Sequence, residues 1–380
     1  MAVKVVIALN SAWNLLNFRS GLIRALVAKG HTVVLAAPAD ENVAALEAMG
    51  ARFVDTPMSS HGTNPLADLA LLLRLFSLLQ RERPDALLAY TAKPNVYGSL
   101  AARCLGVPAI NNIAGLGSVF IKGGFLAGIL KRLYRIALAR SHRVFFQNSD
   151  DLELFLEHGL VMRERTALLP GSGVDLQKFK PASLPSLQKT GTQQDGASRR
   201  FVFLLVARML KDKGVHEYVQ AARWLKASHP HVECALLGPV DGGNPTAVSA
   251  AQMKAWLDEG CVTYWGSSDD VRVQIALADC VVLPSYREGT PRSLLEAAAM
   301  ARPLIATDVP GCREIVRHGT NGLLCKPREP RSLHQRMLDM IGLSGTSLHQ
   351  MGQAGRLLVQ TQFDEQFVIE KYLKSLDELY

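Results

Sequence analysis

Two glutamates, Glu288 and Glu296, stand eight positions apart in a stretch that could bind an anionic ligand. Glu288 lies in a Gly/Thr/Pro turn, and Glu296 lies in an Ala/Leu-rich segment that favours helix. The backbone between them would face a ligand ahead of that helix, because a helix start presents unpaired N–H groups and the positive end of the helix dipole. This backbone belongs to Gly289, Thr290, Pro291, Arg292, Ser293 and Leu294. With the carboxylates holding the hydroxyls of a sugar and a ribose, the stretch indicates a nucleotide-sugar pocket. A surface loop and a helix with two solvated acids are the alternative.

Arg208 and Lys213 follow an apolar run, residues 201–207, that predicts a strand, and they precede a predicted helix start. A bidentate guanidinium and a compact ammonium are suited to a diphosphate. Two solvated loop side chains are the alternative, but a strand end in the same domain as the two glutamates favours the diphosphate. The sequence has no Asp-x-Asp and no His/Asp cluster at metal spacing. We therefore expect no metal ion, with the two cations and the helix dipole supplying the counter-charge.

The elements that must position these residues alternate along the chain as apolar strands and helices, which predicts α/β architecture with two Rossmann-like domains. After a first strand over 3–9, a polar loop runs from Asn10 and the first helix is expected from Phe18. The rhythm stops between Pro170 and Pro181 and restarts near residue 201. We therefore expect an acceptor-binding N-terminal domain over 1–181, a flexible Ser/Thr/Gln-rich linker over 182–200, a nucleotide-sugar-binding domain over 201–362, and a final helix in 363–380 that packs back on the N-terminal domain.

Ligands of open α/β sheets bind outside the carboxyl ends of the strands, so polar residues and glycines in those loops are candidates for substrate contact. No Gly-x-Gly follows the first strand, which argues against a nicotinamide or flavin enzyme. No Ser/His/Asp order or nucleophile elbow occurs either. Ordinary turn residues are the alternative. The candidates are Asn14, Lys93, Asn95, Gly115, Gly117 and Gly266.

Two segments carry a resemblance to a known family: Val-Ala-Arg208-Met-Leu-Lys-Asp-Lys213-Gly and Pro-Ser-Tyr-Arg-Glu288-Gly-Thr-Pro-Arg-Ser-Leu-Leu-Glu296-Ala. The chain resembles retaining glycosyltransferases of family 4, which have the GT-B fold, over nearly its whole length and most strongly over 201–325. The resemblance implies a UDP-sugar donor, with Arg208 and Lys213 on the diphosphate, Glu296 on the ribose and Glu288 on the donor sugar. It also implies retention, in which the leaving diphosphate takes the acceptor proton. Glu288, Arg208 and Lys213 are the predicted catalytic residues.

The first half is similar to a narrower group, transferases that extend undecaprenyl-diphosphate-linked sugars. The similarity lies in Tyr-Thr-Ala-Lys-Pro-Asn-Val-Tyr-Gly-Ser and Asn-Asn-Ile-Ala-Gly-Leu-Gly-Ser. It implies transfer of a hexose or N-acetylhexosamine to a polyprenyl-diphosphate-linked saccharide. The first loop lacks the Gly-Gly of many family-4 enzymes, and residues 111–118 lack the His that several relatives carry, so no catalytic histidine is predicted.

The formal net charge of +8 is concentrated in the first half, where the stretch between Asp85 and Asp150 has no acid and eight Lys or Arg residues. Within it, Phe125–Arg140 predicts an apolar helix with a basic stripe that lies on an anionic membrane surface. A helix packed in the core, with a solvated basic edge, is the alternative. No apolar run reaches the roughly 18 residues of a membrane span, and no signal peptide is recognised. Six cysteines without a Cys-x-x-Cys pair predict free thiols in a reducing compartment. We therefore expect a cytoplasmic protein, peripheral on the inner face of the plasma membrane.

Two other functions are compatible with these features. A UDP-sugar 2-epimerase of the GT-B fold would use the same second domain without an acceptor. A membrane-associated scaffold would catalyse no reaction. Glu288, Glu296, Arg208 and Lys213 together with the basic helix favour transfer. Nucleic-acid binding is not expected, because the basic stretch contains no aromatic-interleaved binding motif.

Overall fold

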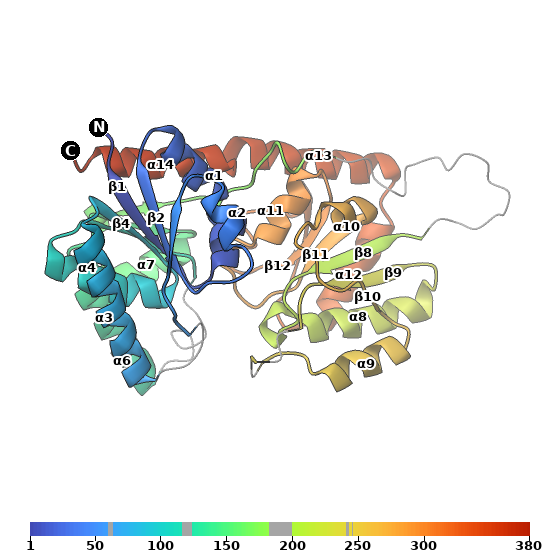
Figure 1. Cartoon of the computed structure of the whole chain (residues 1–380). Coiled ribbons are helices and arrows are strands. Elements are labelled where there is room, and N and C mark those ends of the chain that lie inside the picture. The colour runs from blue at the N-terminus through green and yellow to red at the C-terminus, as the bar shows by residue number, and fades with distance from the viewer. Residues whose placement is uncertain (60–63, 116–123, 182–199, 241–242, 245) are drawn as a thin grey trace. The chain divides into compact units, whose positions relative to one another are not determined.

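The computed structural model describes residues 1–59, 64–115, 124–181, 200–240, 243–244 and 246–380. The chain forms two compact units. Unit 1 comprises Met1–Ser172 and Glu365–Tyr380, and unit 2 comprises Gly173–Asp364 (Figure 1). Each unit is an α/β domain built on one parallel sheet.

The sheet of unit 1 has the strand order β3-β2-β1-β4-β5-β6-β7, and every pairing is parallel. Its strands are short apolar runs because helices cover both faces. The order of the strands reverses between β1 and β4, where loops can diverge to leave a ligand crevice. The strands are β1 (Lys4–Ala8), β2 (Thr32–Ala37), β3 (Arg52–Asp55), β4 (Ala86–Tyr90), β5 (Ala109–Ile113), β6 (Arg143–Phe146) and β7 (Thr166–Leu168).

Two helical layers cover this sheet. One layer consists of α1 (Ala12–Ala28), α2 (Val43–Glu47) and α14 (Glu365–Asp377), whose apolar residues share a core with Val5 and Ile7 of β1. The other layer packs on Val6 and Val144 and contains α3 (Pro65–Glu82), the π-helix η1 (Pro94–Gly98), α4 (Ser99–Leu105), α6 (Phe125–Leu138) and α7 (Ser149–Glu157). A 3-10 turn, η2 (Arg163–Arg165), precedes β7.

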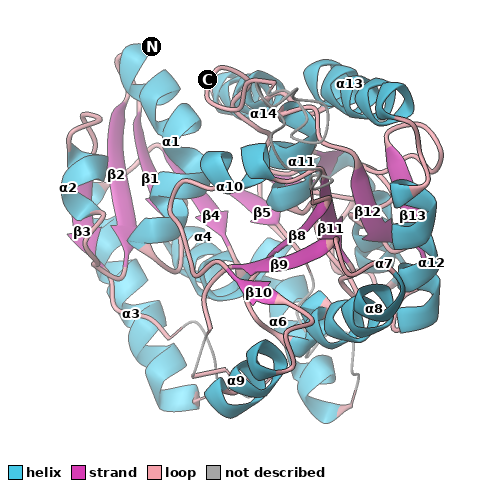
Figure 2. Cartoon of the chain, turned by 90° about the vertical axis from the view of Figure 1, so that its right-hand side faces the viewer, coloured by secondary structure: helices cyan, strands magenta, loops and turns pink. Residues whose placement is uncertain are grey.

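The sheet of unit 2 has the order β10-β9-β8-β11-β12-β13, again with every pairing parallel (Figure 2). Its order reverses between β8 and β11. The strands are β8 (Val202–Val206), β9 (Glu233–Leu237), β10 (Thr263–Tyr264), β11 (Cys280–Leu283), β12 (Leu304–Thr307) and β13 (Gly322–Cys325).

Helices also cover both faces of this second sheet. The residues of α8 (Val215–Ser228), α9 (Ala250–Asp258) and α12 (Pro330–Ile341) fill the core on one face. Those of α10 (Arg272–Leu277) and α11 (Arg292–Ala299) fill the core on the other. The long helix α13 (Gly345–Gln362) contributes residues to both cores, and a 3-10 turn, η4 (Lys211–Lys213), follows β8.

The first helix begins at Ala12, six residues before the predicted start at Phe18. Ser11 caps it, since its side chain accepts a hydrogen bond of 3.1 Å from the Asn14 backbone N–H. Asn14 therefore lies in the first helical turn, and its amide donates to Asn10 Oδ1 at 2.9 Å. The expectation that Asn14 stands in an open loop was wrong, because the Ser11 cap was not recognised.

The boundary between the units also lies earlier in the chain than predicted. Val174 and Phe179 are buried in the core of unit 2, and Arg356 Nη1 donates to the Phe179 carbonyl at 2.8 Å. Gly173–Pro181 had been assigned to the N-terminal domain because the segment has no helical or strand periodicity. Residues 182–199 of the predicted linker lie outside the described residues.

Three smaller features complete the description. Strand β7 was not predicted because it is only three residues long. Across the described ranges, no helix is both long enough and apolar enough to cross a bilayer. All six cysteines are free thiols, and all but Cys104 are buried.

Candidate active site

An ion pair between Lys213 and Glu288 marks the point where the strand order of unit 2 reverses. Lys213 ends the turn after β8, Glu288 lies in the loop after β11, and β8 and β11 are neighbours in the sheet. The Lys213 Nζ to Glu288 Oε1 distance is 2.5 Å, and the side chains are 20% and 12% exposed. The residues predicted to bind the diphosphate and the sugar, Lys213 and Glu288, therefore lie together where doubly wound sheets bind ligands.

Backbone contacts hold the two loops together beside this pair. The Tyr286 N–H donates to the Asp212 carbonyl at 2.9 Å, and Ser285 Oγ donates to the same oxygen at 3.1 Å. Gly214 has a φ of +72°, and a Cβ there would lie 2.0 Å from the Pro284 carbonyl oxygen. Only glycine permits this approach. Gly214 adjoins Lys213 in the sequence, but its role becomes visible only once the second loop is in place.

The loop after β12 supports Glu288 from another direction. The Glu288 N–H donates to the Pro310 carbonyl at 3.2 Å. Gly311, with a φ of +85°, lies so close that a Cβ would come within 2.4 Å of the Gly289 carbonyl oxygen and 2.6 Å of that of Glu288. The turn that carries Glu288 is thus packed against bare backbone.

Helix α11 begins directly after this turn, with Pro291 at its N-cap and no acid in its first turn. Its positive end is therefore not neutralised from within the helix. The expectation that all of residues 289–294 offer backbone donors was too broad, because Pro291 has no N–H and that of Leu294 donates to the Pro291 carbonyl at 3.2 Å. Ser293 lies in the first turn, where backbone N–H groups have no acceptor within the helix.

Glu296 lies one turn further along α11 and is paired with Arg292. The Arg292 Nε to Glu296 Oε1 distance is 2.8 Å. Burial raises the pKa of Glu296, and the Arg292 guanidinium opposes this effect only in part. Arg292 was predicted to act through its backbone, and its side-chain role follows from the i,i+4 spacing. Each candidate carboxylate therefore has a cationic partner.

Arg208 and Gly266 lie along the same carboxyl edge of the sheet. Arg208 is exposed in the loop after β8, and Gly266 follows β10 with a φ of +77°. The Gly238 N–H donates to the Gly266 carbonyl at 2.8 Å, which links the loop after β9 to the loop after β10. Among the residues that the structure describes, no group of three or more His, Cys, Asp or Glu side chains could hold a metal ion.

Unit 1 places its candidates in different environments. Lys93 forms an ion pair of 2.8 Å with Asp68 of α3, and Gly115 is exposed with a φ of +147°. Asn95 is only 1% exposed, because its amide donates to the Asn112 carbonyl at 2.8 Å and accepts from Asn111 at 2.9 Å. The expectation that Asn95 contacts substrate was therefore wrong. Gly117 lies outside the described residues.

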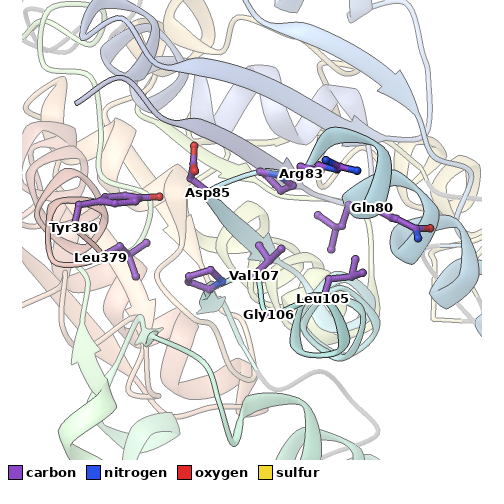
Figure 3. A pocket seen from close by; sticks show the side chains of 11 residues that line it. Gln80, Arg83, Asp85, Leu105, Gly106, Val107, Leu379 and Tyr380 are labelled. Carbon is purple, nitrogen blue, oxygen red and sulfur yellow. The ribbon is translucent and has the colours of Figure 1, made fainter.

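A hollow of about 520 Å³ opens on the opposite edge of the unit 1 sheet, before β4 and β5 (Figure 3). Its walls include Gln80, Arg83, Asp85, Leu105, Val107 and Tyr380. The Asp85 carboxylate accepts from the Lys4 backbone N–H at 2.7 Å and is thus tied to the start of β1. None of the predicted site residues lines this hollow.

Both units match known families. Residues 18–171 match the family described as "Glycosyl transferase 4-like domain", and residues 200–342 match "Glycosyl transferases group 1". The two matches together span more than three quarters of the chain.

Two curated relatives and one solved structure illustrate the similarity. The N,N'-diacetylbacillosaminyl-diphospho-undecaprenol alpha-1,3-N-acetylgalactosaminyltransferase of Campylobacter jejuni is 27% identical over 96% of this chain and 95% of its own. The UDP-Gal:alpha-D-GlcNAc-diphosphoundecaprenol alpha-1,3-galactosyltransferase of Escherichia coli is 25% identical over 68% of this chain and 67% of its own. Anabaena HepE, solved in complex with UDP and glucose, superposes with a TM-score of 0.78 at 20% identity, covering 99% of both chains. The fold is GT-B, as predicted.

Substitution of Gly311 by alanine tests how closely the loops after β11 and β12 must pack. The new Cβ would meet the carbonyl oxygens of Glu288 and Gly289, so we expect Gly311→Ala to lower the free energy of unfolding of unit 2 by more than the roughly 1–2 kcal/mol of a left-handed alanine. Gly319→Ala is the matched control, since its φ is +76° and nothing lies within 4 Å of a new Cβ. Chemical denaturation measures both, and equal losses would contradict the packing argument.

Proposed function

Because the chain belongs to the glycosyltransferases of the GT-B fold, we propose that it transfers a hexose or N-acetylhexosamine from a UDP-sugar to a polyprenyl-diphosphate-linked saccharide in the assembly of a surface or glycoprotein glycan. The observation that carries the donor half of this proposal is the Lys213–Glu288 ion pair at the strand reversal of unit 2. This contact between an ammonium suited to a phosphate and a carboxylate suited to sugar hydroxyls lies at the carboxyl edge of the sheet, which supports the proposal.

On the donor side, Arg208 and Lys213 bind the diphosphate, Glu288 accepts hydrogen bonds from the sugar hydroxyls and Glu296 accepts them from the ribose. The uridine nucleotide is supported by the name of the E. coli relative, a UDP-Gal-dependent galactosyltransferase. The start of α11 adds the N–H group of Ser293 and the positive end of the helix dipole, which no acid in the first turn neutralises. Arg208, Lys213 and the dipole supply the counter-charge without a metal ion.

Donor binding then adds a contact to each of two existing ion pairs, which both persist. An ammonium has three donors, so Lys213 can turn one toward a phosphate oxygen while it keeps Glu288 in place. Arg292 can likewise hold Glu296 through Oε1 while the second carboxylate oxygen accepts from the ribose. Each carboxylate is thus oriented before the donor arrives, which lowers the entropic cost of assembling the site.

The acceptor half of the proposal rests on both curated relatives, whose names specify saccharides linked to undecaprenol through a diphosphate. We place this acceptor on unit 1, where the carboxyl edge carries Lys93 and Gly115. Transfer proceeds with retention: the acceptor hydroxyl attacks from the face that the diphosphate leaves, and the leaving diphosphate takes its proton. The protein contributes positioning and stabilisation of the developing negative charge.

Helix α6 is the proposed contact of unit 1 with anionic lipid. Its inner side is apolar and buried at Ala127, Tyr134, Ala137 and Leu138, so the helix also packs in the core as the alternative interpretation required. Its exposed side carries Ile129, Arg132, Arg135 and Ile136 and no acid. Arg135 also donates to the carbonyls of His158 and Gly159, which holds its charge on the surface. A cationic, partly apolar face of this kind favours an anionic bilayer.

The overall function is tested by incubating the protein with a panel of UDP-sugars, each with and without an undecaprenyl-diphosphate-linked saccharide. We expect one donor to be consumed only when the lipid acceptor is present, with release of UDP and an elongated lipid product. Interconversion of UDP-sugars without acceptor would instead establish the epimerase, and failure of UDP to raise the melting temperature would favour a non-catalytic scaffold.

Removal of either donor-site cation should slow the chemical step. We expect Lys213→Ala and Arg208→Ala each to lower kcat/KM by about a hundredfold, since each group stabilises charge that develops on the leaving diphosphate. Lys226→Ala, which removes an exposed lysine from α8, is the control and should leave kcat/KM unchanged. Steady-state release of UDP measures all three, and near-normal turnover in Lys213→Ala or Arg208→Ala would refute the assigned role.

The raised pKa of Glu296 predicts that donor affinity falls on the acid side. The ionised carboxylate accepts from Arg292 through one oxygen and from the ribose through the other, so protonation removes acceptor capacity. We expect the KM for the UDP-sugar to rise as the pH falls, starting above pH 4.5, the ordinary pKa of glutamate. In Glu296→Gln the KM should be high at every pH, without the rise at low pH. If the KM of this variant still rises at low pH as in the wild type, another group is responsible for the pH dependence.

Charge reversal on α6 should weaken membrane binding. Since each basic residue near an anionic surface contributes about 1 kcal/mol, we expect Arg132→Glu to lower co-sedimentation with phosphatidylglycerol vesicles by about tenfold at low salt and less at high salt. Arg331→Glu makes the same change at an exposed position of α12 in unit 2 and serves as the control. Equal binding of the two variants would contradict the membrane role of α6.

A further inference from the structure

Helix α3 of unit 1 carries leucines on two opposite sides. Leu71, Leu75 and Leu78 face the core and are buried. A second set, which we term the outer leucine line, consists of Leu66, Leu69 and Leu73, which are 78%, 53% and 59% exposed. Their spacing of three and four residues places them in one row along the helix, opposite the core. A surface helix normally carries polar residues there, so a row of exposed leucines indicates an apolar partner.

The charges around the outer leucine line favour a lipid surface as that partner. The row itself continues through Ala70, Ser77 and Gln80 and contains no charged residue. Arg74 and Arg81, both exposed, stand on one flank seven residues apart. Asp68, the acid on the first turn of α3, is drawn inward by Lys93 at 2.8 Å and by the Tyr97 hydroxyl at 2.9 Å. An exposed row of leucines flanked by arginines is typical of a helix that lies at the boundary between lipid headgroups and acyl chains.

An apolar pocket of about 330 Å³ lies beside α3 at the carboxyl ends of β2 and β3. Pro38 follows β2, Pro57 and Met58 follow β3, and Ala67 belongs to the first turn of α3. Two cations complete the lining, Arg74 and Lys93, and Arg74 is held there by donating to the Pro57 carbonyl at 2.9 Å. The pocket thus joins hydrocarbon walls to the positive charge of Arg74 and to the Lys93–Asp68 ion pair, at the carboxyl edge of the sheet.

We propose that the outer leucine line of α3 enters the acyl boundary of an anionic bilayer, and that the adjoining pocket binds the isoprenoid units nearest the diphosphate of the acceptor. The inference rests on the proposed acceptor class. A polyprenyl chain needs an apolar path from the bilayer to the site of reaction, and its diphosphate needs cations at the end of that path. The outer leucine line begins the path, the pocket continues it, and Arg74 and Lys93 stand at its end.

Helices α3 and α6 then divide the membrane contact between them. Both belong to the same layer of unit 1, since α3 packs on α4 and α4 packs on α6 (Figure 1). The basic face of α6 binds headgroups through charge, whereas the outer leucine line binds through burial of apolar surface. The first contribution weakens with salt and the second does not.

The test compares a triple variant, Leu66→Gln, Leu69→Gln and Leu73→Gln, with Leu357→Gln, which changes a leucine of unit 2 that is 62% exposed. Each variant is assayed with two acceptors that carry the same saccharide. In one acceptor the saccharide is linked to undecaprenyl diphosphate embedded in phosphatidylglycerol vesicles. In the other it is linked to citronellyl diphosphate, which is water-soluble. We expect the triple variant to lose vesicle binding by about tenfold or more at both low and high salt. Its KM for the undecaprenyl acceptor should rise by a similar factor, with kcat and KM for the citronellyl acceptor unchanged. Leu357→Gln should match the wild type throughout.

A second variant isolates the pocket. Met58→Gln should raise the KM for the undecaprenyl acceptor while vesicle binding stays at the wild-type level, because Met58 lines the pocket and does not belong to the outer leucine line. A wild-type KM in this variant would overturn the pocket assignment.

Three results would overturn the proposal as a whole: unchanged vesicle binding in the triple variant, an equal loss of activity on both acceptors, or a wild-type dimer that the triple variant dissociates, which would assign the leucines to a second copy. The proposed function fails separately. If the wild-type protein binds vesicles through the leucines but elongates no polyprenyl-linked saccharide, the membrane-binding role of the outer leucine line is supported and the proposed acceptor is refuted.

Discussion

The contact between the loops after β8 and β11 is the constraint on which the proposed donor site depends. It brings Lys213 and Glu288, 75 positions apart, within 2.5 Å, and it exists because Gly214 offers no side chain to the Pro284 carbonyl. The resulting pair offsets the cost of burying its two charges. A half-buried carboxylate and a half-buried ammonium would each be costly alone, but together they keep the edge of the sheet nearly neutral until an anion arrives. The site can therefore hold strong charges without destabilising the domain that presents them.

The two units repeat one sheet topology but use its carboxyl edge differently. Unit 2 places two ion pairs there, whereas unit 1 places one, Lys93–Asp68, beside a buried group of asparagines. The Asn95 amide bonds to the Asn111 amide and to the Asn112 backbone carbonyl, and the amides of Asn111 and Asn112 donate to Ser99 and Tyr372, respectively. This buried network fixes the π-helix η1 to β5 and leaves no amide of Asn95 for a ligand. Polar residues at a strand end can thus belong either to the ligand or to the frame that holds the loop. Only their hydrogen-bond partners distinguish the two cases.

Features that depend on a local sequence pattern could be predicted, whereas features that depend on contacts with distant residues could not. The alternation of strand and helix determined the α/β architecture, because each apolar run is long enough for one buried strand. Arg208, Lys213, Glu288 and Glu296 were placed on one edge, since parallel strands end on the same side. Asn95 was misjudged because its acceptor and donor lie on another strand, and Asn14 because one serine, Ser11, moves the start of α1. The unit boundary at Gly173 was missed because Val174 and Phe179 pack singly, without a periodic pattern.

Helix α14 gives the chain an order of assembly that its sequence order conceals. Unit 2 is one continuous segment, Gly173–Asp364, but unit 1 needs the last residues of the chain. Val368, Ile369, Tyr372 and Leu376 complete the core beside β1, and the Tyr372 hydroxyl accepts from the Asn112 amide at 2.9 Å. During synthesis, the first domain to leave the ribosome is therefore the last that can close. It waits with an open apolar face until α14 has been made, while the second domain already has every residue it needs. The newly made chain is thus most prone to aggregate through unit 1, and a truncation that removes α14 exposes the core of that unit.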